Sequence, residues 1–200
     1  MRRPWHGRPS PQWKDFLRQH AKDIWACDFL TVRTLTFQSL YAFFLIHHAT
    51  REIVHIRVTR YPTALWTGQQ TVNACFEREP PKYLIRDRDS IYGSDFSRKV
   101  NSLGVREVRT PVRAPKANAI AERLVGTLRR ECLDHVFIFN ERHLQKILDE
   151  FVDYYNRQRP HRSLDLRPPC PVSVATGPPR GSVIAEPVLG GLHHVYRRAA

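Results

Sequence analysis

Three carboxylates stand where neither an ordinary core residue nor an ordinary surface residue is expected. Asp28 lies in the middle of the apolar run IWACDFLTV, Asp87 follows the apolar run KYLI, and Glu122 lies near the start of the expected helix in PKANAIAERLVGTLRREC. An unpaired carboxylate in an apolar setting is strongly destabilising unless a cation, a metal or dedicated donors compensate it. Each of the three is therefore a candidate for site chemistry.

Asp28 is expected on a central strand that is covered on both sides. The alternating positions of its run are largely apolar on both faces, which is typical of such a strand. One face carries Ile24, Ala26, Leu30 and Val32, and the other carries Trp25, Cys27 and Phe29. A structural aspartate, bonded to a backbone turn or paired with an arginine, is the alternative interpretation.

The other two carboxylates can also be interpreted as ordinary surface residues. Asp87 follows a short buried strand, where open mixed sheets place their ligands. Asp89 is a second candidate at this point, and the flanking Arg86 and Arg88 also allow a solvated charged turn. Glu122 has no cation three or four residues away on its helix. The alternative interpretation of Glu122 is an ordinary exposed glutamate that is favoured by the helix dipole.

In combination, two aspartates on strands and a glutamate on a helix that packs on the same sheet can form one oxygen-lined pocket. Carboxylate and water ligands suit Mg²⁺ or Mn²⁺. Two such ions, about 3.5–4 Å apart, clamp the attacking and leaving oxygens of a phosphodiester. We therefore expect two divalent ions in the active complex.

The charge balance points to a polyanionic partner. The 200 residues include 32 Lys and Arg against 19 Asp and Glu, which gives a net charge of +13 and a pI near 10.2. Nucleic acid is the commonest partner of such chains, although ribosomal and membrane-surface proteins share this charge. Cations would then hold the DNA backbone while the carboxylates hold the metals.

Cysteine spacing and hydropathy indicate a cytoplasmic protein without a membrane partner. The four cysteines are far apart and show no CxxC or Cys/His spacing, which disfavours a zinc site or a disulfide framework. The apolar run LYAFFLI is too short to cross a bilayer. The N-terminal run lacks the apolar segment of a secretory signal.

The elements that must position the carboxylates follow from periodicity. Three strand-like runs come first and alternating strands and helices follow, which favours one mixed sheet with helices on both faces. The expected strands are 24–32, 39–49, 52–59, 82–85 and 106–110, and the expected helices start near 10, 63, 95, 119 and 140. The segment after residue 181 is expected to form a short hairpin or a loose basic tail. We divide the chain into a basic N-terminal extension with a short helix (1–20), a core (21–166) and a Pro/Gly-rich basic tail (167–200).

Four segments resemble the integrase core family, the catalytic domains of insertion-sequence transposases and retroviral integrases. They are IWACDFLTV, LIRDRDSIYGSDF, APKANAIAERLVGTLRRECLDH and FVDYYNRQRPHRSLDLRPPCP. The third is the most specific, because its Pro, Asn, Ala-Glu-Arg, basic pair and Glu-Cys follow the family pattern. The resemblance implies an RNase H-like α/β fold, with a five-stranded mixed sheet flanked by helices.

The resemblance also implies that Asp28, Asp87 and Glu122 are the family's catalytic, metal-binding triad. Thirty-four residues lie between Asp87 and Glu122, close to the family's usual interval, whereas Asp89 leaves thirty-two and stays an alternative. The implied enzyme is a DDE-type polynucleotidyl transferase. Water activated by metal cleaves a transposon end, and the released 3′-hydroxyl then attacks a target phosphodiester.

Residues around the helical glutamate are the expected DNA contacts. Arg129 projects within about 20° of it, two turns along the helix, where it can touch a phosphate beside the metals. Arg123 and Arg130 project roughly 80–100° away and are expected to line the flanking groove, with a solvated surface charge as the alternative. Lys116 and Asn118, in the preceding loop, are expected to meet the DNA end.

Several other polar residues are expected to be structural. We expect His47 and His48, which close a strand, to serve the fold and not a metal. The run YNRQRPH is expected to pack the last helix onto the core through Tyr155, Asn156, Arg159 and His161.

The expected partners are the transposon ends and the target duplex, with a homo-oligomer assembled on DNA in the bacterial cytosol or nucleoid. Family members carry a helix–turn–helix region that reads the transposon ends, and about two dozen residues precede the first expected strand. We therefore expect a separate helix–turn–helix polypeptide to supply recognition, or the chain to be a fragment. Two alternatives stand beside DNA transposition and integration: a catalytically idle DNA-binding remnant that regulates a full-length transposase, and a structure-selective nuclease.

Overall fold

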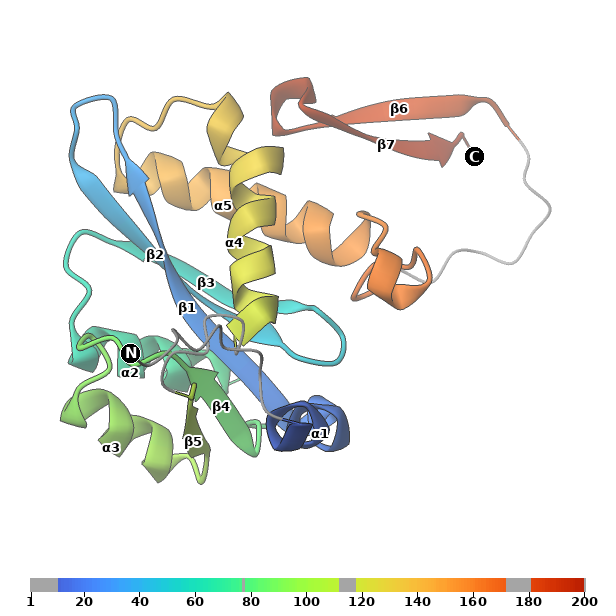
Figure 1. The fold of residues 1–200 in the computed structure, drawn as a ribbon. Coiled ribbons are helices and arrows are strands. Elements are labelled where there is room, and N and C mark those ends of the chain that lie inside the picture. The colour runs from blue at the N-terminus through green and yellow to red at the C-terminus, as the bar shows by residue number, and fades with distance from the viewer. Residues whose placement is uncertain (1–10, 77, 112–117, 172–180, 200) are drawn as a thin grey trace, which may run out of the picture.

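The chain forms a five-stranded mixed sheet flanked by helices, and a separate two-stranded hairpin (Figure 1). The computed structural model describes residues 11–76, 78–111, 118–171 and 181–199. The strands are β1 (Ile24–Arg33), β2 (Ser39–His47), β3 (Ile53–Thr59), β4 (Tyr83–Arg86), β5 (Arg106–Arg109), β6 (Val183–Val188) and β7 (His193–Arg198). The α-helices are α1 (Pro11–Gln19), α2 (Ala64–Ala74), α3 (Ser94–Ser102), α4 (Ala119–Glu131) and α5 (Glu141–Arg157). None of the helices in these ranges is long and apolar enough to cross a membrane.

The strand order β3-β2-β1-β4-β5 puts β1 in the centre of the sheet. β1 pairs antiparallel with β2 and parallel with β4, and β2 pairs antiparallel with β3. The parallel pair β4 and β5 completes the sheet through the connecting helix α3. The mixed five-stranded sheet expected from the sequence is confirmed.

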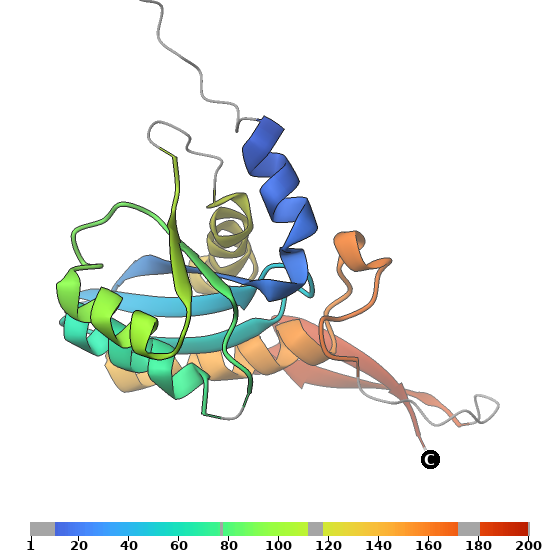
Figure 2. The ribbon, with the colours of Figure 1, turned by 90° about the horizontal axis from the view of Figure 1, so that it is seen from below.

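Helices cover both faces of this sheet, and each face has its own core. Ala26 and Leu30 of β1 belong to the core that includes residues of α1, α4 and α5. Trp25 and Cys27 belong to the opposite core, which is built with α2 and α3. Figure 2 shows α2 and α3 lying side by side. The expectation that β1 is covered on both sides is therefore confirmed.

The C-terminal segment folds as a hairpin, one of the two forms expected for it. Among the strands of the described residues, β6 and β7 pair only with each other, and most of their residues are exposed. The hairpin is held to the core near η5 (Leu189–Gly191), where the His193 ring stacks on Tyr154 with 4.6 Å between ring centroids. His193 Nε2 also lies 2.6 Å from the Glu131 carbonyl oxygen.

Buried Asn156 of α5 ties that helix to the first residue of the edge strand β3. The Ile53 N–H donates to Asn156 Oδ1 at 2.9 Å, and Asn156 Nδ2 donates to the Ile53 carbonyl at 3.0 Å. His161 Nε2 lies 3.1 Å from the Tyr155 carbonyl oxygen, and the two rings meet edge to face. The run YNRQRPH thus packs α5 on the core, as expected.

We predict that Asn156→Ala lowers the free energy of unfolding by about 2–4 kcal/mol, because it leaves both backbone groups of Ile53 without their partner. Urea denaturation followed by circular dichroism measures this change. The matched control is Asn101→Ala, an exposed position of α3, which should stay within about 0.5 kcal/mol of wild type. Equal losses in the two variants would contradict this role for Asn156.

Candidate active site

Asp28 lies in the middle of the central strand and is half-buried. Because side chains alternate along a strand, it shares the face of Ala26 and Leu30, the face that α4 covers. The Phe29 N–H donates to Asp28 Oδ1 at 2.8 Å. The second carboxylate oxygen has no hydrogen bond from any residue that the structure describes. An oxygen is therefore available for a ligand.

Asp87 comes directly after the end of β4, the parallel neighbour of β1. Ala26 pairs with Ile85, and these residues lie two positions before Asp28 and Asp87. Continuing this register brings the two carboxylates opposite each other on the same face of the sheet. Asp87 Oδ1 accepts the Asp89 N–H at 3.0 Å, which fixes the side chain beside its strand.

Asp89 occupies a different environment. It is exposed, and its Oδ1 accepts the Ile91 N–H at 2.9 Å, so it shapes the turn that follows β4. Asp87, in contrast, is half-buried and one residue from the strand end. The local structure therefore favours Asp87 over Asp89 as the second carboxylate.

Glu122 lies in the first turn of α4, the helix that covers Asp28. Ala121 and Leu124 of this helix are buried in the core beneath it. The buried Asn118, at the N-cap position, donates from Nδ2 to the Cys27 carbonyl at 3.2 Å, so the start of α4 is fixed next to Asp28. Glu122 itself is exposed, and no hydrogen bond or ion pair holds it among the described residues.

Electrostatics links these carboxylates to one another. Burial raises the pKa of the Asp28 carboxyl to about 6, and the Phe29 N–H opposes this rise. The negative charges of Asp87, Glu122 and Asp89 raise the pKa further. These carboxylates therefore lie within electrostatic reach of Asp28, and a cation between them would relieve their mutual repulsion.

The donor set fits a hard divalent cation, because it consists of carboxylate oxygens. Across residues 11–76, 78–111, 118–171 and 181–199, no three His, Cys, Asp or Glu side chains are grouped closely enough to hold a metal ion. Binding by the triad therefore requires a side chain to move. Glu122 is the one that can, because it is exposed and unrestrained in the described structure.

Arg86 supports the site from the opposite side of the sheet, a role that was not predicted from the sequence. It is only 2% exposed, so it is not part of a solvated turn. Its Nε donates to Glu107 Oε2 at 2.7 Å, and its Nη1 donates to the Asp87 carbonyl at 3.0 Å. The alternation in YLIR places Arg86 on the same buried face as Leu84. This pattern could have indicated that Arg86 is buried.

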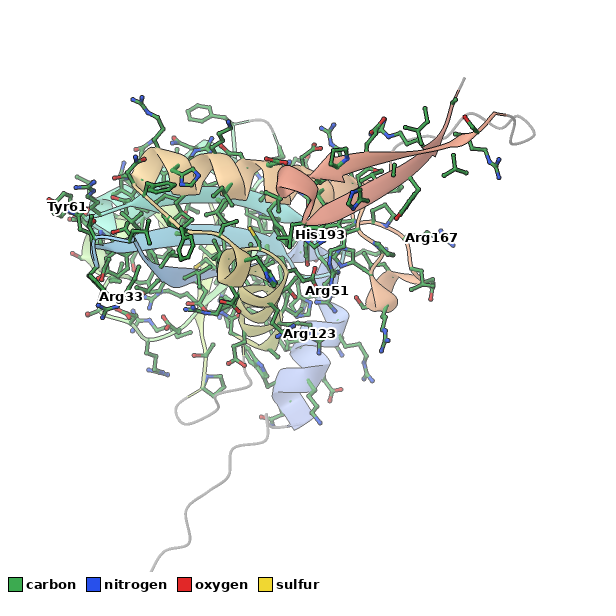
Figure 3. The ribbon with its side chains drawn as sticks, turned by 90° about the horizontal axis from the view of Figure 1, so that it is seen from above. Arg33, Arg51, Tyr61, Arg123, Arg167 and His193 are labelled. Carbon is green, nitrogen blue, oxygen red and sulfur yellow. The ribbon has the colours of Figure 1, made fainter. Side chains whose placement is uncertain are left out.

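The residues that were predicted to contact DNA do not lie together in one site. Lys116 lies outside the described residues, and Asn118 is buried at the start of α4. Arg129 is exposed, and its Nη2 donates to the Thr31 carbonyl of β1 at 3.1 Å. Arg123 and Arg130 line a different pocket of α4, and Figure 3 shows Arg123 near Arg51. The lining of that pocket includes none of the three carboxylates.

His47 and the cysteines do not add a catalytic group. His47 Nε2 lies 3.1 Å from the Lys22 carbonyl oxygen, and the Thr50 N–H donates to its Nδ1 at 3.2 Å. Burial lowers the pKa of both His47 and His48. All four cysteines are free, and burial raises the pKa of the Cys27 thiol, which makes it a poor nucleophile.

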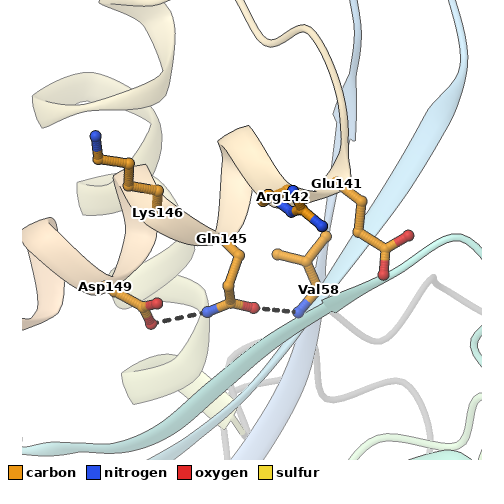
Figure 4. A pocket seen from close by; sticks show the side chains of 6 residues that line it. All are labelled: Val58, Glu141, Arg142, Gln145, Lys146 and Asp149. Carbon is orange, nitrogen blue, oxygen red and sulfur yellow. Dashed lines mark hydrogen bonds between the residues drawn. The ribbon is translucent and has the colours of Figure 1, made fainter.

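A pocket of about 580 Å³ between β3 and α5 serves the fold (Figure 4). Its lining contains none of the predicted site residues and consists of Val58, Glu141, Arg142, Gln145, Lys146 and Asp149. Gln145 Oε1 accepts the Val58 N–H at 2.8 Å, and Gln145 Nε2 donates to Asp149 Oδ1 at 2.8 Å. Gln145 thereby satisfies a backbone donor of the edge strand, which protects that edge from pairing.

Comparison with known proteins agrees with this architecture. Residues 103–169 match the integrase core domain family, a range that includes Glu122 and begins after Asp28 and Asp87. The transposase InsD of insertion element IS2A/D/F/H/I/K from Escherichia coli is 28% identical over 134 residues, which are 63% of this chain and 44% of that protein. The chain spans 62% of the InsD relative of element IS2E. It therefore covers less than two thirds of these curated relatives.

Two solved structures share the fold. One is a chain of the simian T-cell lymphotropic virus intasome in complex with PP2A regulatory subunit B56 gamma, with a TM-score of 0.61, 13% identity and coverage of 88% of this chain and 66% of that one. The other is the HTLV-2 integrase catalytic core domain in complex with magnesium, with a TM-score of 0.50, 11% identity and coverage of 71% and 90%. The expected RNase H-like fold is confirmed. Over residues 103–169 the chain is thus similar to the integrase core domain family, it is distantly homologous to the InsD transposases of element IS2, and it shares its fold with retroviral integrase catalytic cores.

Proposed function

We propose that residues 21–166 form the catalytic core of a transposase that cleaves DNA ends and joins them to a target in a metal-dependent reaction. The observation that carries this proposal is the crowding of negative charge around a half-buried aspartate. Asp87 and Glu122 both raise the pKa of Asp28, in a protein whose net charge is +13. Such a concentration of carboxylates in a basic protein suits divalent cations that act on DNA.

In this proposal each carboxylate has a defined role. Asp28 and Asp87 provide ligands from adjacent strands, where the sheet limits their movement. Glu122 completes the site by turning its side chain from the first turn of α4. Bound Mg²⁺ or Mn²⁺ would activate the attacking oxygen and neutralise the leaving oxygen of the phosphodiester. Arg129, seven residues further along α4, holds a neighbouring phosphate of the same strand.

The proposed partners are the two ends of a transposon and a target duplex. Bringing two ends together needs more than one subunit, so we propose a homo-oligomer on DNA. The chain spans 44% of the InsD transposase described above. We also propose a separate helix–turn–helix polypeptide as a partner that reads the transposon ends.

A cleavage and joining assay tests the proposal. The purified chain, given Mn²⁺ and a labelled duplex, should nick the duplex and produce joined species, whereas Glu122→Gln should give neither product. Glu79→Gln, an exposed carboxylate outside the site, is the matched control and should keep full activity. DNA binding without any cutting would support the idle remnant, and cutting without joining would indicate a nuclease.

A further inference from the structure

A second pocket, of about 510 Å³, lies beside α4 and is lined by arginines from four parts of the chain. Arg51 comes from the turn between β2 and β3, and Arg123 and Arg130 come from α4. Arg159 follows α5, and Arg162 opens η4 (Arg162–Leu164). We call this the arginine pocket. Its lining residues include no carboxylate, so the cavity itself is strongly positive.

The positive charge of the arginine pocket is mostly uncompensated. Arg159 is the exception, because its Nε and Nη2 each donate to a carboxylate oxygen of Glu131 at 2.6 Å. Among the described residues, none of the other four arginines forms an ion pair with a carboxylate. Like charges in one concave site repel each other, and an anion in the pocket would relieve that repulsion.

Arg51 carries the clearest mark of a missing partner. Its Nη1 is buried and has no hydrogen-bond partner among the described residues. Its backbone has a φ of 65°, the left-handed region that a branched or bulky side chain rarely adopts. Burial and the nearby charge of Arg123 both lower the pKa of Arg51, and Figure 3 shows these two side chains close together. An unpaired buried guanidinium nitrogen is destabilising unless something binds it.

Phosphate is the anion whose chemistry fits this set best. Guanidinium groups bind phosphate through paired N–H donors, and several arginines can share its oxygens. The hydroxyl groups of Thr127 and Ser163 also line the pocket and can donate to the same oxygens. We propose that the arginine pocket binds a backbone phosphate of DNA at a point separate from the three carboxylates.

The position of the pocket on α4 supports a DNA strand as the source. Arg123 and Arg130 project from α4 about 80–100° around the helix from Glu122, at 100° per residue. Glu122 and the arginine pocket therefore lie on adjacent sides of α4. A strand that passes over α4 contacts both. This identification of the polymer rests on the proposed function, whereas the binding of phosphate does not.

DNA binding in EDTA tests the pocket without any need for metal or catalysis. Fluorescence anisotropy with a labelled duplex should show about tenfold weaker binding for Arg51→Gln/Arg162→Gln, and a log K against log salt slope smaller by one to two units. The control is Arg106→Gln/Arg142→Gln, which removes the same charge from exposed positions of β5 and α5. It should keep the wild-type slope. Arg162→Gln alone, an exposed position, should give part of the effect if the double variant folds poorly.

A second arm separates the sources of phosphate. Inorganic phosphate should raise the melting temperature of wild type and of the control, but not that of Arg51→Gln/Arg162→Gln. Loss of this shift with unchanged DNA binding would assign the pocket to free phosphate or a small phosphorylated ligand. Pocket and control variants that match in both measurements would overturn the proposal. If the chain did not cleave DNA, the proposed function would be overturned. The evidence for phosphate binding in the arginine pocket would still stand, because neither of these two measurements depends on cleavage.

Discussion

Asp28→Asn is expected to raise the free energy of unfolding at pH 7 by about 2–3 kcal/mol while it abolishes metal-dependent DNA cutting. The folded-state pKa of Asp28 is about 6 against an ordinary value of 3.8, so the charged form is destabilising in the fold. Asparagine keeps an acceptor for the Phe29 N–H and removes the charge. It also removes a proposed metal ligand. Stability and activity therefore change in opposite directions.

The pH dependence follows from the direction of this pKa shift. Between about pH 4 and pH 6 the folded state binds the Asp28 proton more tightly than the unfolded state, so wild-type stability falls as the pH rises through this range. The Asp28→Asn variant does not lose stability in this way, because asparagine does not ionise. Its advantage should be near zero at pH 4 and complete above pH 6.

Urea denaturation at pH 4.5 and pH 7 measures this difference, and the Mn²⁺ cleavage assay measures activity. Asp134→Asn is the matched control, because it removes the same charge from an exposed position. It should leave both stability and cutting unchanged. A variant of Asp28 that gains no stability, or that still cuts DNA, would contradict the account of this residue.

The neighbouring aspartates Asp87 and Asp89 are expected to differ strongly in their effect on DNA cleavage. Asp87→Asn should lower the rate of strand cleavage by about 100-fold or more, because it weakens a direct ligand of the reacting metals. Asp89→Asn should change the rate by no more than about threefold, because an asparagine oxygen still accepts the Ile91 N–H of the turn. Single-turnover cleavage with saturating Mn²⁺ compares the two rates directly.

Each of these two variants serves as the control for the other, because they lie two residues apart and remove the same charge. The reverse ranking would assign the second ligand to Asp89. Equal large losses would mean that the turn after β4, and not one carboxylate, determines activity. Circular dichroism of both variants should match wild type, since each aspartate lies outside the strand itself.

Much of the arrangement could be predicted from short-range patterns. The alternation in IWACDFLTV correctly predicted which residues of β1 face each core, and hence the face on which Asp28 lies. Asp87 was correctly placed just past a buried strand. The first helix was correctly expected to start near residue 10. These features depend on residues that are close together in the sequence, so periodicity and capping reveal them.

Features made by distant segments could not be predicted in this way. Arg86 of β4 pairs with Glu107 of the neighbouring strand β5, and the burial of Asn118 depends on where α4 meets Cys27. The arginine pocket joins Arg51 to residues more than seventy positions later. The sequence shows each of these side chains as a polar or charged residue, and only the tertiary fold gives it a partner or leaves it without one.

If Asp28, Asp87 and Glu122 together bind divalent cations, Mn²⁺ binding by the chain depends on these three side chains, and it can be measured without reference to catalysis. Electron paramagnetic resonance of free Mn²⁺ should show saturable binding to the wild-type chain. The triple variant Asp28→Asn/Asp87→Asn/Glu122→Gln should lose this binding, while Asp134→Asn/Glu79→Gln/Asp89→Asn, which removes the same number of charges elsewhere, should retain it. Equal Mn²⁺ binding by wild type and the first triple variant would show that these three carboxylates do not form the metal site.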